Sequence, residues 1–168
     1  MTNHMKCAWP AAMLLTLLVG VTPVWGADDP RVENLALCRD SWLDWKNTDP
    51  AKLDSLAAFL RSTFAHNGND VFVVPKSPMA IDGLKVTQVF PQSVGMGVGF
   101  SVLVDATFDV ARRALEPALG KPLGQCETSD GMRACEAPIA EQRTVVLMSG
   151  DPPNDRTTLV GCYYLYEK

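Results

Sequence analysis

Few residues of this chain are suited to catalysis. Of its two histidines, His4 lies within the first 26 residues and His66 is the only one beyond them. A Ser-His-Asp or Cys-His site would therefore have to be built on His66. The same count excludes a zinc site made of several histidines. We predict that His66 lies in the last turn of a helix, where the helix dipole favours an imidazolium, and that its role is structural.

Paired carboxylates are the other candidates for chemistry, because two acids that flank a glycosidic bond can hydrolyse it. Glu127 and Glu136 are predicted to be diagonal neighbours on the outer face of a hairpin. Neither is flanked by the apolar residues that suit a general acid. We therefore expect no catalytic residues, and a small carboxylate-dependent hydrolase is kept only as an alternative.

Residues 95–100, Gly-Met-Gly-Val-Gly-Phe, have the glycine content of a phosphate-binding loop without its spacing. The third glycine comes one position early for a dinucleotide-binding fingerprint, no lysine follows, and the segment continues as a strand. We therefore expect no cofactor. Read with a period of two, Gly95, Gly97 and Gly99 share one nearly bare face of that strand. Such a face indicates close approach by a helix of this chain, by a ligand or by a partner.

The loop 150–156 is predicted to join the last two strands. Its adjacent prolines stiffen it, and its acidic side chains could meet a basic partner. A stiff loop loses less entropy on binding than a flexible one. The tyrosines of the final strand fit either a core or an interface, and both interpretations stay open. The predicted partner-binding residues are Gly95, Gly97, Gly99, Asp151, Pro152, Pro153, Asn154, Asp155 and Arg156.

Four cysteines follow the apolar N-terminal stretch that contains Cys7, and they allow three pairings. Asp130-Gly131 is a strong signal for a two-residue hairpin turn, and Cys126 and Cys135 are equidistant from it. They would face each other at a non-hydrogen-bonded position, where side chains approach most closely. Free thiols or a metal cluster are the alternatives, but paired C-x-x-C spacings are absent and we expect no metal. The predicted disulfides are Cys126–Cys135 and Cys38–Cys162.

The first 26 residues are typical of a secretory signal. Lys6 supplies its positive charge, residues 11–21 its short apolar region, and Gly26 the small residue before the cleavage site. An uncleaved anchor is the alternative. We predict cleavage after Gly26 and a periplasmic or secreted protein, in a compartment where disulfides persist.

Composition limits the partners of residues 27–168, which we expect to form one domain with no membrane-inserted segment. The full chain of 168 residues has a formal net charge of −4, and removal of Lys6 makes the remainder more acidic. Binding to nucleic acid by counterion release is therefore excluded, and a charged partner is expected to be basic. No oligomeric state is predicted.

The pattern of apolar residues predicts three helices and an antiparallel sheet. Asp-Pro pairs at 29–30 and 49–50 are typical N-caps with a first-turn proline. The first helix is predicted to continue through Cys38, Trp42 and Trp45, the second to Asn67-Gly68, and the third to begin at Asp105 with Phe108, Ala111, Leu115 and Leu119 inward. Strands are predicted at 71–74, 78–81, 84–90, 95–104, 123–128, 132–139, 143–148 and 157–166, with a second hairpin turn at Asp82-Gly83.

These expectations combine into an α+β fold, an antiparallel β-sheet with two or three helices packed on one face and two disulfides. Because no residue is expected to be catalytic, the sequence favours a non-catalytic protein-binding module. An inhibitor or immunity-type protein directed against an envelope-acting enzyme suits its small size, acidic charge and stiff loop. A carrier of a small apolar ligand, held between helices and sheet, is the main alternative.

Overall fold

The computed structural model describes residues 27–40, 49–66, 68, 71–94, 97–150 and 152–164. The predicted signal, Trp42, Trp45 and the predicted helix stop at Asn67 lie outside the described residues. The helices are α1 (Pro30–Ala36), α2 (Pro50–Thr63) and α3 (Phe108–Leu119). The strands are β1 (Ala27–Asp28), β2 (Phe64–His66), β3 (Val73–Pro75), β4 (Met79–Ile81), β5 (Leu84–Phe90), β6 (Ser93–Val94), β7 (Gly97–Val104), β8 (Glu127–Ser129), β9 (Met132–Ala140), β10 (Arg143–Gly150) and β11 (Thr158–Tyr164).

The first two helices begin as predicted. The carboxylate of Asp29 accepts hydrogen bonds from the backbone N–H groups of Arg31 at 2.9 Å and Val32 at 3.1 Å. The carboxylate of Asp49 accepts one from the N–H of Ala51 at 2.9 Å. Each cap thus satisfies N–H groups that the helix itself leaves without a partner.

Both helices end earlier than predicted. The first ends at Ala36, and Cys38 already has a positive φ of 59° that the helix cannot continue through. The second ends at Thr63, where the ammonium of Lys76 binds the carbonyls of Arg61 at 2.7 Å and Ser62 at 3.3 Å.

The placement of His66 in a helix was therefore wrong. Phe64–His66 form strand β2, which pairs with β3, and His66 is exposed opposite Val73. Phe64 is buried, so pairing lets the strand bury an aromatic side chain and satisfy its backbone groups at once.

The third helix begins later than predicted. Its N-cap is Thr107, whereas Asp105 lies before the helix with its carboxylate 3.4 Å from the ammonium of Lys85. The N–H of Asp105 donates to the carbonyl of Lys85 at 2.9 Å, which extends the sheet instead of starting the helix. Phe108, Ala111 and Leu115 are buried as predicted, whereas Leu119 is half-buried, and Gly120 caps the end of the helix with a φ of 66°.

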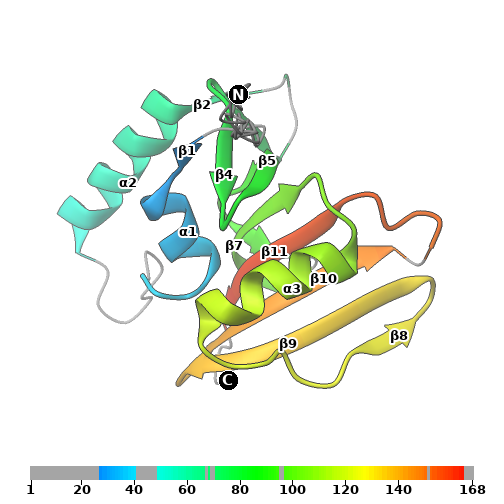
Figure 1. The fold of residues 1–168 in the computed structure, drawn as a ribbon. Coiled ribbons are helices and arrows are strands. Elements are labelled where there is room, and N and C mark those ends of the chain that lie inside the picture. Colours follow the sequence, from blue (N-terminus) through cyan, green and yellow to red (C-terminus); the bar gives the residue numbers. More distant parts are fainter. Residues whose placement is uncertain are drawn as a thin grey trace, which may run out of the picture.

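The strands form one sheet in the order β1-β4-β5-β7-β11-β10-β9-β8 (Figure 1). Of the remaining strands, β3 pairs with β5 and β2, and β6 pairs with β7. Every pairing is antiparallel except that of β1 with β4. The two Asp-Gly turns are confirmed. Asp82 and Gly83 have φ values of 45° and 74°, and Asp130 and Gly131 have φ values of 53° and 73°, as a type I′ hairpin turn requires.

Both predicted disulfides are confirmed. In the β8–β9 hairpin Glu127 lies opposite Ala134, a register that places Cys126 opposite Cys135 with their Cα atoms 4.3 Å apart. That distance fits a non-hydrogen-bonded pair. The second disulfide joins Cys38, just after α1, to Cys162 on β11, with a Cα–Cα distance of 5.0 Å.

The core lies between the helices and one face of the sheet, which confirms the predicted α+β fold. Figure 1 shows α1 and α3 on the same side of β7, β11 and β10. Among the described residues no helix is both long enough and apolar enough to span a bilayer. The largest fully buried side chains are Phe100, Phe108, Leu35, Leu37, Ile81, Leu115 and Leu147.

The long disulfide should contribute more stability than the short one. The two bonds close segments with sequence separations of 124 and 9 residues. In the chain-entropy model the double variant Cys38→Ala/Cys162→Ala loses about 4 to 5 kcal/mol of unfolding free energy, and Cys126→Ala/Cys135→Ala about 2 to 3 kcal/mol. Guanidinium chloride unfolding followed by circular dichroism measures both. Equal losses would show that chain entropy is not the dominant contribution.

Candidate functional site

The predicted binding loop stands out from the end of the β10–β11 hairpin. Pro152, Pro153, Asn154 and Arg156 are exposed, and Asp155 is half-buried. The loop is held at its base, because the hydroxyl of Ser149 donates to the carbonyl of Thr157 at 2.8 Å. Asp151 lies outside the described residues. The contribution of this loop to binding stays a prediction.

The bare face of the glycine strand is filled by the chain itself. A Cβ atom on Gly97 would lie 1.8 Å from the Tyr163 ring, and one on Gly99 would lie 2.0 Å from the carbonyl oxygen of Cys162. The group that approaches these two glycines is therefore the neighbouring strand β11. The sequence had suggested a helix of this chain, a ligand or a partner. Gly95 lies outside the described residues. That Gly97 and Gly99 also contact a partner stays a prediction.

The last strand is divided between two roles. Tyr164 is buried and packs in the core, whereas Tyr163 is half-buried on the opposite face over Gly97. Tyr166, the third tyrosine of the predicted strand, lies outside the described residues. The strand therefore serves as core through one of its faces.

A row of apolar side chains crosses the sheet on the face that the helices leave uncovered. Leu103 on β7 lies opposite Leu159 on β11, and Leu159 lies opposite Met148 on β10. Ala134 on β9 continues the row beside Met148. All four are half-buried, whereas their strand neighbours Val102, Val104, Val160 and Leu147 point into the core. We call Leu103, Leu159, Met148 and Ala134 the apolar row.

Acidic side chains mark one end of the apolar row. Glu127 on the edge strand β8 lies opposite Ala134, and Glu136 is its diagonal neighbour on the same face, as predicted. Both are exposed. The enclosure that carboxylate-based acid catalysis requires is therefore missing around this pair. At the other end of the row, Gln88 on β5 lies opposite Leu103.

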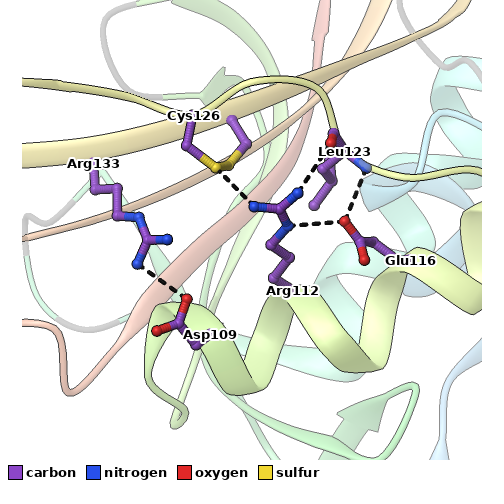
Figure 2. Close-up of a disulfide and its surroundings, with 7 residues drawn as sticks. Asp109, Arg112, Glu116, Leu123, Cys126 and Arg133 are labelled. Atoms are coloured by element: carbon purple, nitrogen blue, oxygen red, sulfur yellow. Dashed lines mark hydrogen bonds and ion pairs between the residues drawn. A yellow bond between two sulfur atoms is a disulfide. The ribbon is translucent and has the colours of Figure 1, made fainter.

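On the helix side of the β8–β9 hairpin, Arg112 links helix α3 to the short disulfide (Figure 2). Its guanidinium donates to the Glu116 carboxylate at 2.8 Å, to the sulfur of Cys126 at 3.1 Å and to the carbonyl of Leu123 at 3.2 Å. Glu116 also accepts from the N–H of Leu123 at 3.1 Å. The hydrogen bond from Arg112 holds the pKa of Glu116 below its usual value; partial burial opposes this effect and the Leu123 N–H adds to it.

A second arginine fixes the start of the same helix to the sheet. The Arg133 guanidinium lies 4.2 Å from the centre of the Phe108 ring and donates to Asp109 at 3.0 Å. Sequence reasoning missed both arginines. The i,i+4 spacing of Arg112 and Glu116 was a usable signal for an ion pair, but not for contact with a sulfur.

A small cleft of about 250 Å³ lies between the start of α1, the end of α2 and the connection from β3 to β4. Its charged groups already serve the fold, because Asp29 caps α1 and Lys76 binds the last carbonyls of α2. Within the described part of the chain, no three His, Cys, Asp or Glu side chains are grouped as metal ligands would be. The cleft is lined by Asp29, Ser62, Thr63, Lys76, Ser77, Pro78 and Met79.

Comparison of the chain with protein-family models, with curated proteins and with solved structures gave no match. The function therefore has to be argued from the geometry of the chain itself.

Close packing of Tyr163 on Gly97 predicts a double-mutant effect. Gly97→Ala should lower the unfolding free energy by about 1 to 3 kcal/mol, because the new methyl group overlaps the ring. In a Tyr163→Ala background this loss should largely disappear, since the ring is gone. Gly99→Ala is the matched control: its Cβ would meet the backbone carbonyl of Cys162, so its cost should persist in both backgrounds. Denaturant unfolding of the six proteins gives the comparison, and an unchanged Gly97→Ala cost without the ring would contradict this packing.

The depressed pKa of Glu116 predicts acid-dependent stability. A carboxylate with a lowered folded pKa stabilises the fold above its unfolded value, roughly 4.3, and this contribution is lost as the pH falls through the folded value. Melting temperatures of the wild type and Glu116→Gln should therefore differ at neutral pH and converge in acid. Carbon-detected NMR titration should show the Glu116 pKa rising in Arg112→Ala. A titration unaffected by Arg112→Ala would contradict the assigned cause.

Proposed function

We propose that this protein is a non-catalytic protein-binding module, exported to the periplasm or secreted after cleavage near Gly26. Within that class we propose an inhibitor or immunity-type protein directed against an envelope-acting enzyme. The observation that carries the proposal is the apolar row on the uncovered face of the sheet. The two disulfides support export, because such bonds persist in oxidising compartments outside the cytoplasm.

The apolar row has the features of an interface centre. Its side chains come from neighbouring strands in fixed register, so they are held in place before a partner arrives. An antiparallel sheet with one face in water usually alternates apolar and polar residues, yet here one outward position on each of β7, β11 and β10 carries leucine or methionine. Contiguous apolar surface rimmed by polar residues is typical of protein contact sites. Preorganised strands also reduce the entropy lost on binding.

Charge defines the chemistry of the partner. Glu127 and Glu136 flank one end of the apolar row, and Asp155 lies in the loop that joins β10 to β11. The whole chain is acidic, with a formal net charge of −4. The partner we propose presents an apolar centre with a basic rim, an arrangement that speeds encounter and selects against acidic proteins.

The two alternatives have less support. A carrier of an apolar ligand needs space between helices and sheet, but Phe100, Phe108 and Leu147 fill that layer and are fully buried. A carboxylate-dependent hydrolase would depend on Glu127 and Glu136, which lie open to solvent.

Substitution within the apolar row should abolish partner binding without unfolding the protein. We expect Leu159→Lys or Met148→Lys to weaken association at least tenfold, because each places a charge at the centre of the contact. Val110→Lys is the matched control, since Val110 is 43% exposed on helix α3 and lies on the other side of the sheet. Immobilised wild type and variants are compared by capture from envelope extract with quantitative mass spectrometry, followed by calorimetry with the purified partner. Equal capture by all four proteins would remove the row from the proposal.

The loop provides a second arm of the same experiment. Charge reversal at Asp151 and Asp155 should weaken association with a basic partner and reduce its dependence on salt. Affinity that is unchanged at every salt concentration would exclude the loop while leaving the apolar row in place.

A further inference from the structure

The two disulfides lie in different surroundings. Cys38, just after the end of helix α1, and Cys162 on β11 are 1% and 0% exposed. In the other disulfide Cys135 is also buried, at 1%, but Cys126 is half-buried next to β8, an edge strand whose residues are all exposed. Cys126 is thus the most exposed of the four bonded cysteines, and we expect an incoming thiolate to reach it more easily than the other three.

A fixed positive charge lies against that same sulfur. Arg112 donates to the sulfur of Cys126 at 3.1 Å, and its guanidinium stays protonated at all physiological pH values. A cation at this distance attracts an attacking thiolate to Cys126. After reduction it stabilises the Cys126 thiolate, the reactive form of a cysteine. The side chain is itself held by its bonds to Glu116 and Leu123 (Figure 2).

Other charged groups near Cys126 could strengthen or weaken the attraction that Arg112 exerts on a thiolate. Glu116 shares Arg112 and offsets part of its positive charge. Arg133 and Asp109 form a pair with each other at the start of the same helix. Glu127 and Glu136 occupy the opposite face of the hairpin. The cation nearest the sulfur is Arg112, and the carboxylate that most directly opposes it is Glu116.

We propose that Cys126–Cys135 is a thiol–disulfide exchange site, with Cys126 as the exchanging sulfur and Arg112 as its positioning residue. The substrate class is a thiolate, from a small thiol or from a protein dithiol. This assignment does not rest on the proposed binding function, because the site lies on the helix side of the hairpin.

The proposed thiol–disulfide exchange proceeds in two steps. A thiolate attacks the Cys126 sulfur, the bond to Cys135 breaks, and Cys135 leaves as a thiolate that then takes up a proton. A second thiolate attacks the sulfur that is now bound to Cys126, forms a disulfide with it, and releases the Cys126 thiolate. The external thiols lose two electrons, which the protein gains, and the reverse reaction restores the bond.

The fold around the site can persist through this cycle. We expect the three β8–β9 pairs, and the bonds from Arg112 and Glu116 to Leu123, to persist after reduction because none of them involves the sulfur atoms. The Cys38–Cys162 bond continues to join the end of α1 to β11. Both thiols therefore stay close enough to be reoxidised.

The test follows reduction of each disulfide separately. The oxidised protein is treated with reduced glutathione, or with reduced thioredoxin as a protein dithiol, and new thiols are alkylated and assigned by peptide mass spectrometry. We expect Cys126–Cys135 to be reduced while Cys38–Cys162 stays intact. Reaction with glutathione identifies a small thiol as sufficient, and reaction with thioredoxin alone identifies a protein dithiol. Failure of both reductants without prior unfolding would overturn the proposal.

Four variants separate an electrostatic role from a merely structural one. Arg112→Ala should slow reduction at pH 7 about tenfold and shift alkylation of the reduced Cys126 to higher pH. Glu116→Gln should do the opposite, because it removes the opposing charge. Arg112→Lys should restore part of the rate, and Arg113→Ala, on the exposed neighbour in the same helix, should leave it unchanged. Should Arg112→Ala and Glu116→Gln both move the rate in one direction, together with the melting temperature, the arginine is only a brace and the proposal fails.

Discussion

The covalent bond between Cys38 and Cys162 fixes the arrangement of this fold. It ties the end of α1, a helix of seven residues, to β11, which lies between β7 and β10 near the middle of the sheet. A helix of that length is not stable by itself in water. Bonded to a central strand, it can bury Val32 and Leu35 against the sheet at little further loss of entropy. The position of the first helix against β11 depends on this link, whereas Phe108, Ala111 and Leu115 of α3 bury the same face of the sheet without it.

The helices cover only one face of the sheet, so the opposite face is available for binding. Leu103, Leu159 and Met148 lie in register at outward positions of β7, β11 and β10, and they gain no contact from α1 or α3 on the opposite face. Part of the outer face is covered locally, since Val94 of β6 lies against Gly99 and Gly161, and Tyr163 lies over Gly97. The apolar row lies beside this covered region. An apolar centre with acidic side chains at one end is the physical basis for the proposed assignment of this face to a protein partner.

Local signals in the sequence were sufficient for most of the fold. Asp-Pro caps, Asp-Gly turns and the equidistance of Cys126 and Cys135 depend on short-range geometry, so they could be predicted without knowing the tertiary contacts. The end of α2 could not, because Phe64–His66 leave the helix to pair with β3, a contact that no local pattern encodes. The filling of the glycine face by Tyr163 and the approach of Arg112 to a sulfur likewise depend on which strands and helices meet. Of the candidate site, the acidic pair was predicted and the apolar row was not, since outward leucines are unremarkable until register aligns them.

The β8–β9 hairpin brings the two proposed sites to opposite sides of one small element. Successive residues of a strand point to opposite faces, so Cys126 and Cys135 face helix α3 while Glu127 and Glu136 flank the apolar row. The disulfide therefore lies on the reverse side of the hairpin from the two acidic residues at the end of the proposed docking face. Because β8 pairs with β9 at only three positions, that end of the face depends on the disulfide more than the leucines of the central strands do. The proposed exchange at Cys126 would therefore act on the acidic end of the proposed docking face, where electrostatic attraction governs the rate of encounter.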